Sequence, residues 1–293
     1  IFISFEYKFD FTIGTYHQSK CLKYNDCKCA TERIYKNYWI YCIIMTTIVS
    51  CYYKTKISKH SHESYDNWIR AFVLNLQEVN IIVFTQASDK QYLTDIFEQN
   101  KHVNYKIVVK ELTDFEIVQK YPDVWEHQEK IDPQQHISRR KECYIIWNSK
   151  FNFVKEAMDM NPFQSDYFIW NDIGNVRNIH SVKCLHTYPN QSKISEDKLD
   201  IILLRPFVNT PNIFYNNEVH FSGSMFGGHK NILYTLHKKY YEVFELYIQH
   251  KQFIGCDQQL ISTMYRQHPS LFNTIIPQRG IIDEWFYLYY YYS

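Results

Sequence analysis

Asp172 is the acid most suggestive of chemistry, because it follows a short apolar stretch, residues 167–170, and precedes Gly174. The aromatic and branched residues of this stretch predict a buried strand, and the glycine predicts a turn just beyond it. In open α/β sheets, ligands bind beyond the carboxyl ends of the strands. Asp172 therefore lies where a carboxylate can hold a divalent cation against a diphosphate. Because Asp and Gly are also common turn residues, the pattern fits a simple turn as well.

The composition limits the class of protein. The chain has 293 residues, of which 45% are hydrophobic, enough to bury the full core of one α/β domain. Its formal charge is +1, and lysines and arginines are interspersed with acids, so no basic surface for nucleic acid is expected. The abundance of Tyr, Ile, Asn and Lys beside scarce Gly and Ala indicates an AT-rich genome.

Residues 1–44 differ from the rest of the chain. They contain no Met, four of the eight cysteines, and no helical or strand period. We expect translation to start at Met45 and residues 1–44 to be an N-terminal extension outside the fold. Zinc binding by Cys21, Cys27 and Cys29 is the alternative, although their spacing lacks the two Cys-x-x-Cys pairs of common zinc modules.

The nearly uncharged residues 38–53 raise the question of a membrane anchor. This stretch is shorter than the about 20 apolar residues of a spanning helix, and it is rich in β-branched and aromatic residues. The cysteines after Met45 occur singly, as reduced thiols of an intracellular protein would. We therefore expect no membrane span and a cytoplasmic location.

Strands and helices alternate after Met45. Strands are predicted at residues 46–53, 80–86, 105–109, 167–170, 198–204, 219–226 and 272–276. Helices are predicted at 64–76, 88–100, 138–160, 175–186, 229–250 and 256–265, with an irregular segment at 112–132. This βαβ rhythm predicts an α/β fold with a parallel sheet and helices on both faces, because parallel neighbours need a crossover.

Local signals mark several element ends. Ser88 and Asp89 are natural caps for the helix at 88–100, and Asn161-Pro162 should end the long helix at 138–160. Gly227-Gly228 is expected to close the strand at 219–226.

Short motifs in a fixed order carry a family resemblance. They are Thr46-Thr-Ile-Val-Ser-Cys-Tyr-Tyr53, Ser58-Lys-His-Ser61, Tyr65-x-x-Trp68, Ile82-Val-Phe-Thr85, Trp147-Asn-x-Lys150, Asn161-Pro-Phe163, Trp170-Asn-Asp-Ile-Gly174 and Gly255-Cys-Asp-Gln258. Together they resemble the WlaTC/HtrL (YibB-like) glycosyltransferase family, from Met45 to about Trp285. The resemblance implies a single GT-A-like domain at 45–293, with a mixed, mainly parallel sheet, and a nucleotide-sugar-dependent hexosyltransferase activity.

The resemblance also gives roles to the two acids. Asp172 would bind Mn²⁺ or Mg²⁺, which prefer carboxylate, water and phosphate oxygens and would stabilise the leaving diphosphate. Asn171 stands where many GT-A enzymes have a second acid and would offer only a neutral oxygen. Asp257, at the start of a helix, would be the general base of an inverting transfer or would orient donor hydroxyls in a retaining one. Helix capping is the alternative role for Asp257.

Further contacts are expected from residues near these acids. Tyr52 could stack on the donor base, Thr85 could bond the base or ribose, and Lys150 could neutralise the diphosphate. Trp170 and Asn171 complete the predicted donor contacts, and Gly223 and Trp285 are the predicted acceptor contacts. Core packing is the alternative for Tyr52 and Thr85, a solvated helix face for Lys150, and a tight bend for Gly223. Trp285 and the tyrosines after it could form a flexible flap or complete the core.

Two functions other than sugar transfer are compatible with the predicted α/β fold. A methyltransferase should have a glycine-rich turn after the first strand, but this turn is Tyr52-Tyr-Lys-Thr55. A non-catalytic nucleotide- or carbohydrate-binding protein of the same fold would bind its ligand without turnover. The sequence thus favours transfer of a sugar from a nucleotide-sugar donor to a glycan or glycoconjugate acceptor.

Overall fold

The computed structural model describes residues 46–55, 60–134, 140–215 and 218–293. Residues 44–293 form one compact unit. The predictions for residues 1–44, including the start at Met45 and the alternative zinc site, lie outside the described residues.

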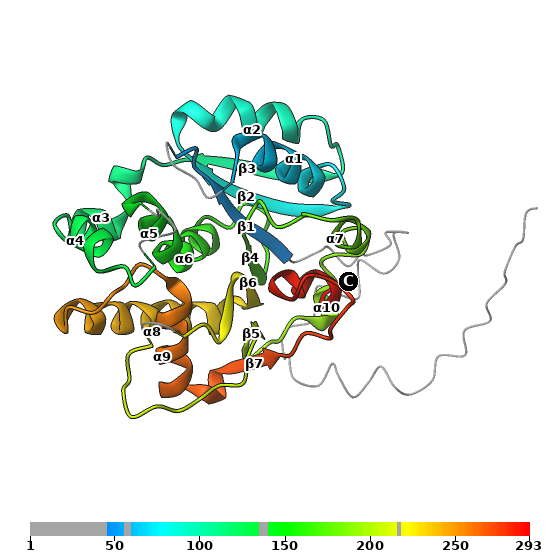
Figure 1. The fold of residues 1–293 in the computed structure, drawn as a ribbon. Helices are drawn as coiled ribbons and strands as arrows, with labels where there is room; N and C mark the ends of the chain where they lie inside the picture. The colour runs from blue at the N-terminus through cyan, green and yellow to red at the C-terminus, as the bar shows by residue number, and fades with distance from the viewer. Residues whose placement is uncertain (1–45, 56–59, 135–139, 216–217) are drawn as a thin grey trace, which may run out of the picture. The chain divides into compact units, whose positions relative to one another are not determined.

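The described residues form a seven-stranded sheet in the order β3-β2-β1-β4-β6-β5-β7 (Figure 1). Its strands are β1 (Thr46–Tyr52), β2 (Val79–Thr85), β3 (Val103–Val109), β4 (Tyr167–Asn171), β5 (Leu199–Leu203), β6 (Phe221–His229) and β7 (Phe272–Ile275). β6 runs antiparallel to both of its neighbours, β4 and β5, and the other neighbouring pairs are parallel. This arrangement confirms the predicted α/β fold with a mixed, mainly parallel sheet.

Helices cover both faces of the sheet, as predicted (Figure 1). The buried side chains of one face pack against four helices, α1 (His62–Val73), α2 (Lys90–Phe97), α7 (Ile179–Cys184) and α10 (Leu288–Tyr291). The other face packs with α3 (Glu116–Lys120), α4 (Val124–Ile131), α5 (Lys141–Asn148), α6 (Lys150–Met160), α8 (Lys230–Gln249) and α9 (Asp257–Gln267). Successive strand side chains alternate between the two cores, with Ile169 in one and Trp170 in the other.

Stacked aromatic rings fix α6 and β6 against β4. Phe153 of α6 lies parallel to Trp170 of β4, with ring centroids 5.9 Å apart and an interplanar angle of 10°. Phe226 of β6 lies 6.4 Å from Trp170, and Phe151 of α6 lies 4.7 Å from Phe226. Because all of these side chains are buried, the strand that ends before Asp172 has a rigid position.

The prediction of one continuous helix at 138–160 is wrong, because a break at Ser149 divides this segment into α5 and α6. The Ser149 hydroxyl donates to the carbonyl of Ile145, at 2.7 Å, a side-chain bond that competes with helix continuation. The break places Lys150 at the start of α6, where its side chain is buried. The predicted end at Asn161 is confirmed, since Asn161 adopts the left-handed conformation with φ 30°.

Other boundary predictions are also corrected. Residues 112–132 are largely helical rather than irregular, because they contain the short helix η4 (Leu112–Asp114), α3 and α4. The helix predicted at 175–186 covers only Ile179–Cys184. Asp89 makes no side-chain cap for α2, and its carboxylate instead accepts from the backbone amide of Lys54 at 2.8 Å.

Gly227 and Gly228 lie inside β6 rather than closing it. A Cβ on Gly227 would lie 2.9 Å from the Tyr292 hydroxyl and 3.0 Å from Ile169 Cγ1. A Cβ on Gly228 would lie 3.0 Å from the carbonyl oxygen of Lys198. The glycines therefore allow neighbouring segments to approach the strand closely.

The tyrosines after Trp285 complete the core. Tyr289 and Tyr292 are fully buried, and the Tyr292 hydroxyl donates to Asp200 Oδ2 at 2.9 Å. Asp200 is itself buried in β5, so this bond ties the C-terminal segment to the sheet.

Replacing Tyr292 with phenylalanine removes that bond without removing the ring. We expect the free energy of unfolding to fall by about 1–3 kcal/mol, because a buried carboxylate loses a donor. Urea unfolding measures the change. Tyr290→Phe is the control, since Tyr290 is 42% exposed, and an equal loss in both variants would contradict the assignment.

Candidate functional site

A pocket of about 640 Å³ opens at the carboxyl ends of β1 and β4. It is called the central pocket here, and its walls include residues 51–55, 172–175, 223–224, 256–259, Trp285 and Phe286. After β3, on one side of β1, the chain returns to β4 on the other side. Ligand sites of α/β proteins commonly lie at such a reversal in strand order.

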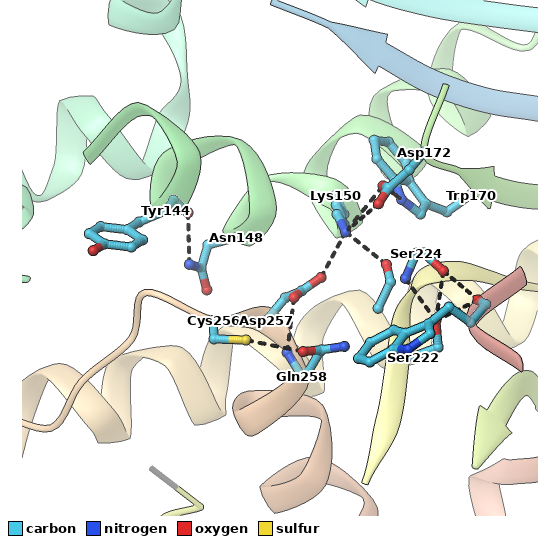
Figure 2. Close-up of polar contacts among 12 residues, drawn as sticks. Tyr144, Asn148, Lys150, Trp170, Asp172, Ser222, Ser224, Cys256, Asp257 and Gln258 are labelled. Atoms are coloured by element: carbon cyan, nitrogen blue, oxygen red, sulfur yellow. Dashed lines mark hydrogen bonds and ion pairs between the residues drawn. The ribbon is translucent and has the colours of Figure 1, made fainter. Parts of the chain in front are cut away.

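Three charged side chains meet at this pocket (Figure 2). Lys150 Nζ lies 3.2 Å from Asp172 Oδ1 and 2.9 Å from Asp257 Oδ2, and it donates to the carbonyl of Gly223 at 2.7 Å. We call Lys150, Asp172 and Asp257 the charged triad. The Lys150 and Asp257 side chains are 5% and 7% exposed, whereas 35% of Asp172 is exposed, so Asp172 is the acid most open to a ligand.

The triad sets the ionisation of its members. Burial alone would lower the pKa of Lys150, but the Asp172 and Asp257 carboxylates outweigh it and raise that pKa, so the ammonium stays charged at neutral pH. Burial raises the pKa of Asp172, although Lys150 and Trp170 both favour its charged form. By formal charge, one ammonium and two carboxylates give the triad a net charge of −1.

Trp170 and the backbone of β6 hold Asp172 in place. The indole Nε1 of Trp170 donates to Asp172 Oδ1 at 2.8 Å, and the backbone amide of Asp172 donates to the carbonyl of Ser224 at 2.9 Å. Since Trp170 is only 1% exposed, its role is to orient the acid from beneath.

Asp257 is the first residue of α9, and its Oδ1 accepts from the backbone amide of Gln258 at 3.0 Å. Its Oδ2 contacts the Lys150 ammonium and makes no directional hydrogen bond with a described residue. A Cβ on Gly223 would lie 2.5 Å from this oxygen. Gly223 is therefore the residue that lets Asp257 pack against β6 and reach Lys150.

The other predicted contacts fall into two groups. Tyr52 and Trp285 line the central pocket. Thr85 is fully buried and donates to the carbonyl of Tyr52 at 2.6 Å, and Trp170 and Asn171 are buried beneath the pocket floor. These three do not line the pocket, so their side chains act behind it.

Trp285 is tethered. Its carbonyl accepts hydrogen bonds from the hydroxyls of Ser222, at 2.9 Å, and Ser224, at 2.7 Å. Both serines belong to β6, which also supplies Gly223. The indole is 37% exposed and forms part of the pocket wall.

The side chains of the central pocket can bind a divalent cation such as Mg²⁺ only if a bound substrate supplies further oxygen ligands. Within the described residues, no three His, Cys, Asp or Glu side chains are grouped to hold a metal. Asp172 offers one partly exposed carboxylate in a triad with net charge −1. Mg²⁺ commonly binds through one or two carboxylates plus substrate phosphates and water, so Asp172 fits that mode.

Arg177 is a pocket residue that sequence analysis missed. Its guanidinium carbon lies 4.3 Å from the Trp68 ring and 5.0 Å from the Phe286 ring. The only local signal was its place three residues after Gly174, in the segment that follows the Asp172 strand.

Within the described parts of the chain, no disulfide joins Cys51, Cys143, Cys184 or Cys256 to another cysteine. None of the helices in the described parts of the chain is long and apolar enough to cross a bilayer.

Comparison with known proteins gives one family. Residues 45–293 match the model of a family described as a bacterial protein of unknown function (HtrL_YibB). No curated protein matches the chain in sequence. Among solved structures, mouse xyloside xylosyltransferase 1 in its apo form is similar, with 11% identity over 78% of this chain and 84% of that chain, and a TM-score of 0.44.

Replacing Lys150 with methionine tests the charged triad. Two neighbouring carboxylates would lose their shared cation, so we expect the free energy of unfolding at pH 7 to fall by about 3 kcal/mol. The deficit should shrink at pH 5, because protonation relieves the repulsion between the unpaired acids. Chemical denaturation at both pH values measures this.

Lys155→Met is the matched control on the same helix. Its exposed pair with Asp159 should contribute less than about 1 kcal/mol. A Lys150 variant as stable as the Lys155 variant, at both pH values, would contradict the role of the triad.

Proposed function

Because the chain belongs to the HtrL_YibB family, we propose a function that its site supports: transfer of a hexosyl group from a nucleotide-diphospho-sugar to a hydroxyl of a glycan or glycoconjugate. The observation that carries this proposal is the charged triad, in which Lys150 joins Asp172 and Asp257 at the floor of the central pocket. The fold brings these three residues together from α6, the end of β4, and α9.

The reaction breaks the bond between the anomeric carbon and the diphosphate oxygen, which leaves with the bonding electrons. The acceptor oxygen forms the new bond to the anomeric carbon and loses its proton. In an inverting transfer, Asp257 takes this proton, because its carboxylate lines the central pocket at the start of α9. In a retaining transfer, the leaving diphosphate oxygen takes this proton, and Asp257 orients the donor hydroxyls instead.

Lys150 has two roles in this account. It holds the Asp257 carboxylate in place, since its ammonium lies 2.9 Å from Oδ2. It also supplies positive charge beside the sugar while the acceptor approaches. Its own charge is balanced by two carboxylates, so it is not the main counterion of the diphosphate predicted from the sequence.

Asp172 would hold Mn²⁺ or Mg²⁺ against the diphosphate. When bound, such a cation offsets the negative charge that develops on the leaving group. The partial exposure of Asp172 and the net charge of the triad support this assignment. Tyr52 would stack on the donor base and Trp285 would contact the acceptor, a proposal supported by the position of both residues in the wall of the central pocket.

Thermal unfolding of the full chain with UDP, GDP, CMP and dTDP, with and without Mn²⁺, tests the donor class. A ligand that binds only the folded state adds about 3 kcal/mol at a hundredfold excess over its Kd. We expect one nucleotide to raise the melting temperature, more strongly with Mn²⁺, and Asp172→Asn to remove the Mn²⁺-dependent part.

Asp95→Asn is the control, because Asp95 is an exposed residue of α2 outside the pocket. If no nucleotide stabilises the wild-type protein, the transferase assignment is wrong. Stabilisation that ignores both Mn²⁺ and Asp172 would retain nucleotide binding but refute the role of Asp172 as the metal ligand.

A further inference from the structure

The walls of the central pocket carry too few positive side chains to balance the charge of a bound nucleoside diphosphate. Its described walls carry four carboxylates, Asp132, Asp172, Asp257 and Asp283, against three Lys or Arg side chains, Lys54, Lys150 and Arg177. Lys150 is committed to the triad. A bound diphosphate adds further negative charge and needs its own partner.

Arg177 is suited to be that partner. Among the described residues, no carboxylate forms an ion pair with it, although it is exposed to the pocket. Its Nε donates to the carbonyl of Gly174 at 3.0 Å, which leaves the two terminal nitrogens of the guanidinium available. A guanidinium can then bind two phosphate oxygens at once.

Aromatic rings fix the orientation of this guanidinium. Trp68 of α1 and Phe286 of η8 (Glu284–Phe286) contact it, at 4.3 and 5.0 Å. Gly174 makes this possible, because a Cβ there would lie 3.2 Å from the Tyr65 ring and 3.5 Å from the Trp68 ring. The segment after Asp172 can therefore lie close to α1, which places Arg177 beside Trp68.

We propose that Arg177 binds the diphosphate of the nucleotide donor, an inference that rests on the proposed function. Arg177 and Asp172 both line the central pocket, so both can contact one diphosphate. The sugar then extends toward Lys150 and Asp257. Arg177 is thus the residue that distinguishes nucleoside diphosphates from monophosphates and nucleosides.

Isothermal titration calorimetry on the full chain tests this. The probes are uridine, UMP and UDP, with the guanosine and thymidine series beside them, all in the presence of Mn²⁺. We expect the wild-type protein to bind one diphosphate more tightly than its monophosphate. Arg177→Gln should weaken the diphosphate about 10- to 100-fold and the nucleoside less than about threefold, because only the phosphate contacts are lost.

Three further variants make the result specific. Arg177→Lys should recover part of the lost affinity, because it keeps the charge but not the bidentate geometry. Lys54→Gln removes the third Lys or Arg of the described pocket walls, the rival candidate for the diphosphate, and Arg205→Gln removes an exposed arginine outside the pocket. Arg205→Gln should leave diphosphate binding within about threefold of the wild type, and Lys54→Gln should weaken it less than Arg177→Gln does.

Unchanged diphosphate affinity in Arg177→Gln would overturn the inference, as would a loss that falls equally on the nucleoside and reflects disturbed packing at Trp68. A loss in Lys54→Gln instead would assign the diphosphate to Lys54 and overturn it too. A wild-type protein that binds none of the probes would refute the proposed function itself, which separates that failure from failure of the Arg177 assignment.

Discussion

The burial of one ammonium group is the constraint on which the rest of this structure depends. Lys150 is 4% exposed, and a buried charge is tolerated only when it is paired and hydrogen-bonded. Two carboxylates and one carbonyl meet that need. To do so, α6 must begin at Lys150, Asp257 must open α9, and Gly223 must leave space on β6. Features that look local therefore serve a single electrostatic cluster.

The members of this cluster differ in their exposure to the pocket. Lys150 and Asp257 lie deep, where the low exposure strengthens their interaction, whereas Asp172 is partly open to a ligand. The acids and Lys150 leave a net negative charge. A diphosphate would thus enter with a cation at Asp172 and with Arg177 as a second positive group. The tethered Trp285 gives the pocket a fixed wall beside the triad.

Much of the fold could be predicted from the sequence, because hydrophobic period and strand length are local properties. The predicted ends of the strands at 46–53 and 167–170 lie within one residue of the observed ends. The sequence pattern also indicates Asp172 and Asp257 as candidate site residues. The burial of Lys150 could not be read from a helical period, since it depends on the break at Ser149 and on residues over 70 positions away.

Arg177 was missed for the same reason: its ring contacts come from Trp68 and Phe286, on two distant segments. Thr85, Trp170 and Asn171, which were predicted to contact the donor, are buried and do not line the pocket.

The central claim is that the charged triad is a centre of sugar transfer, and turnover in an Asp257→Asn variant tests it most directly. The measurement is release of nucleoside diphosphate from a panel of nucleotide sugars by the full chain, with nucleotide binding followed in parallel. The account predicts that one donor is consumed by the wild type, and that the variant binds this nucleotide but loses about 100-fold or more of the turnover. Turnover by Asp257→Asn equal to that of the wild type would contradict the account.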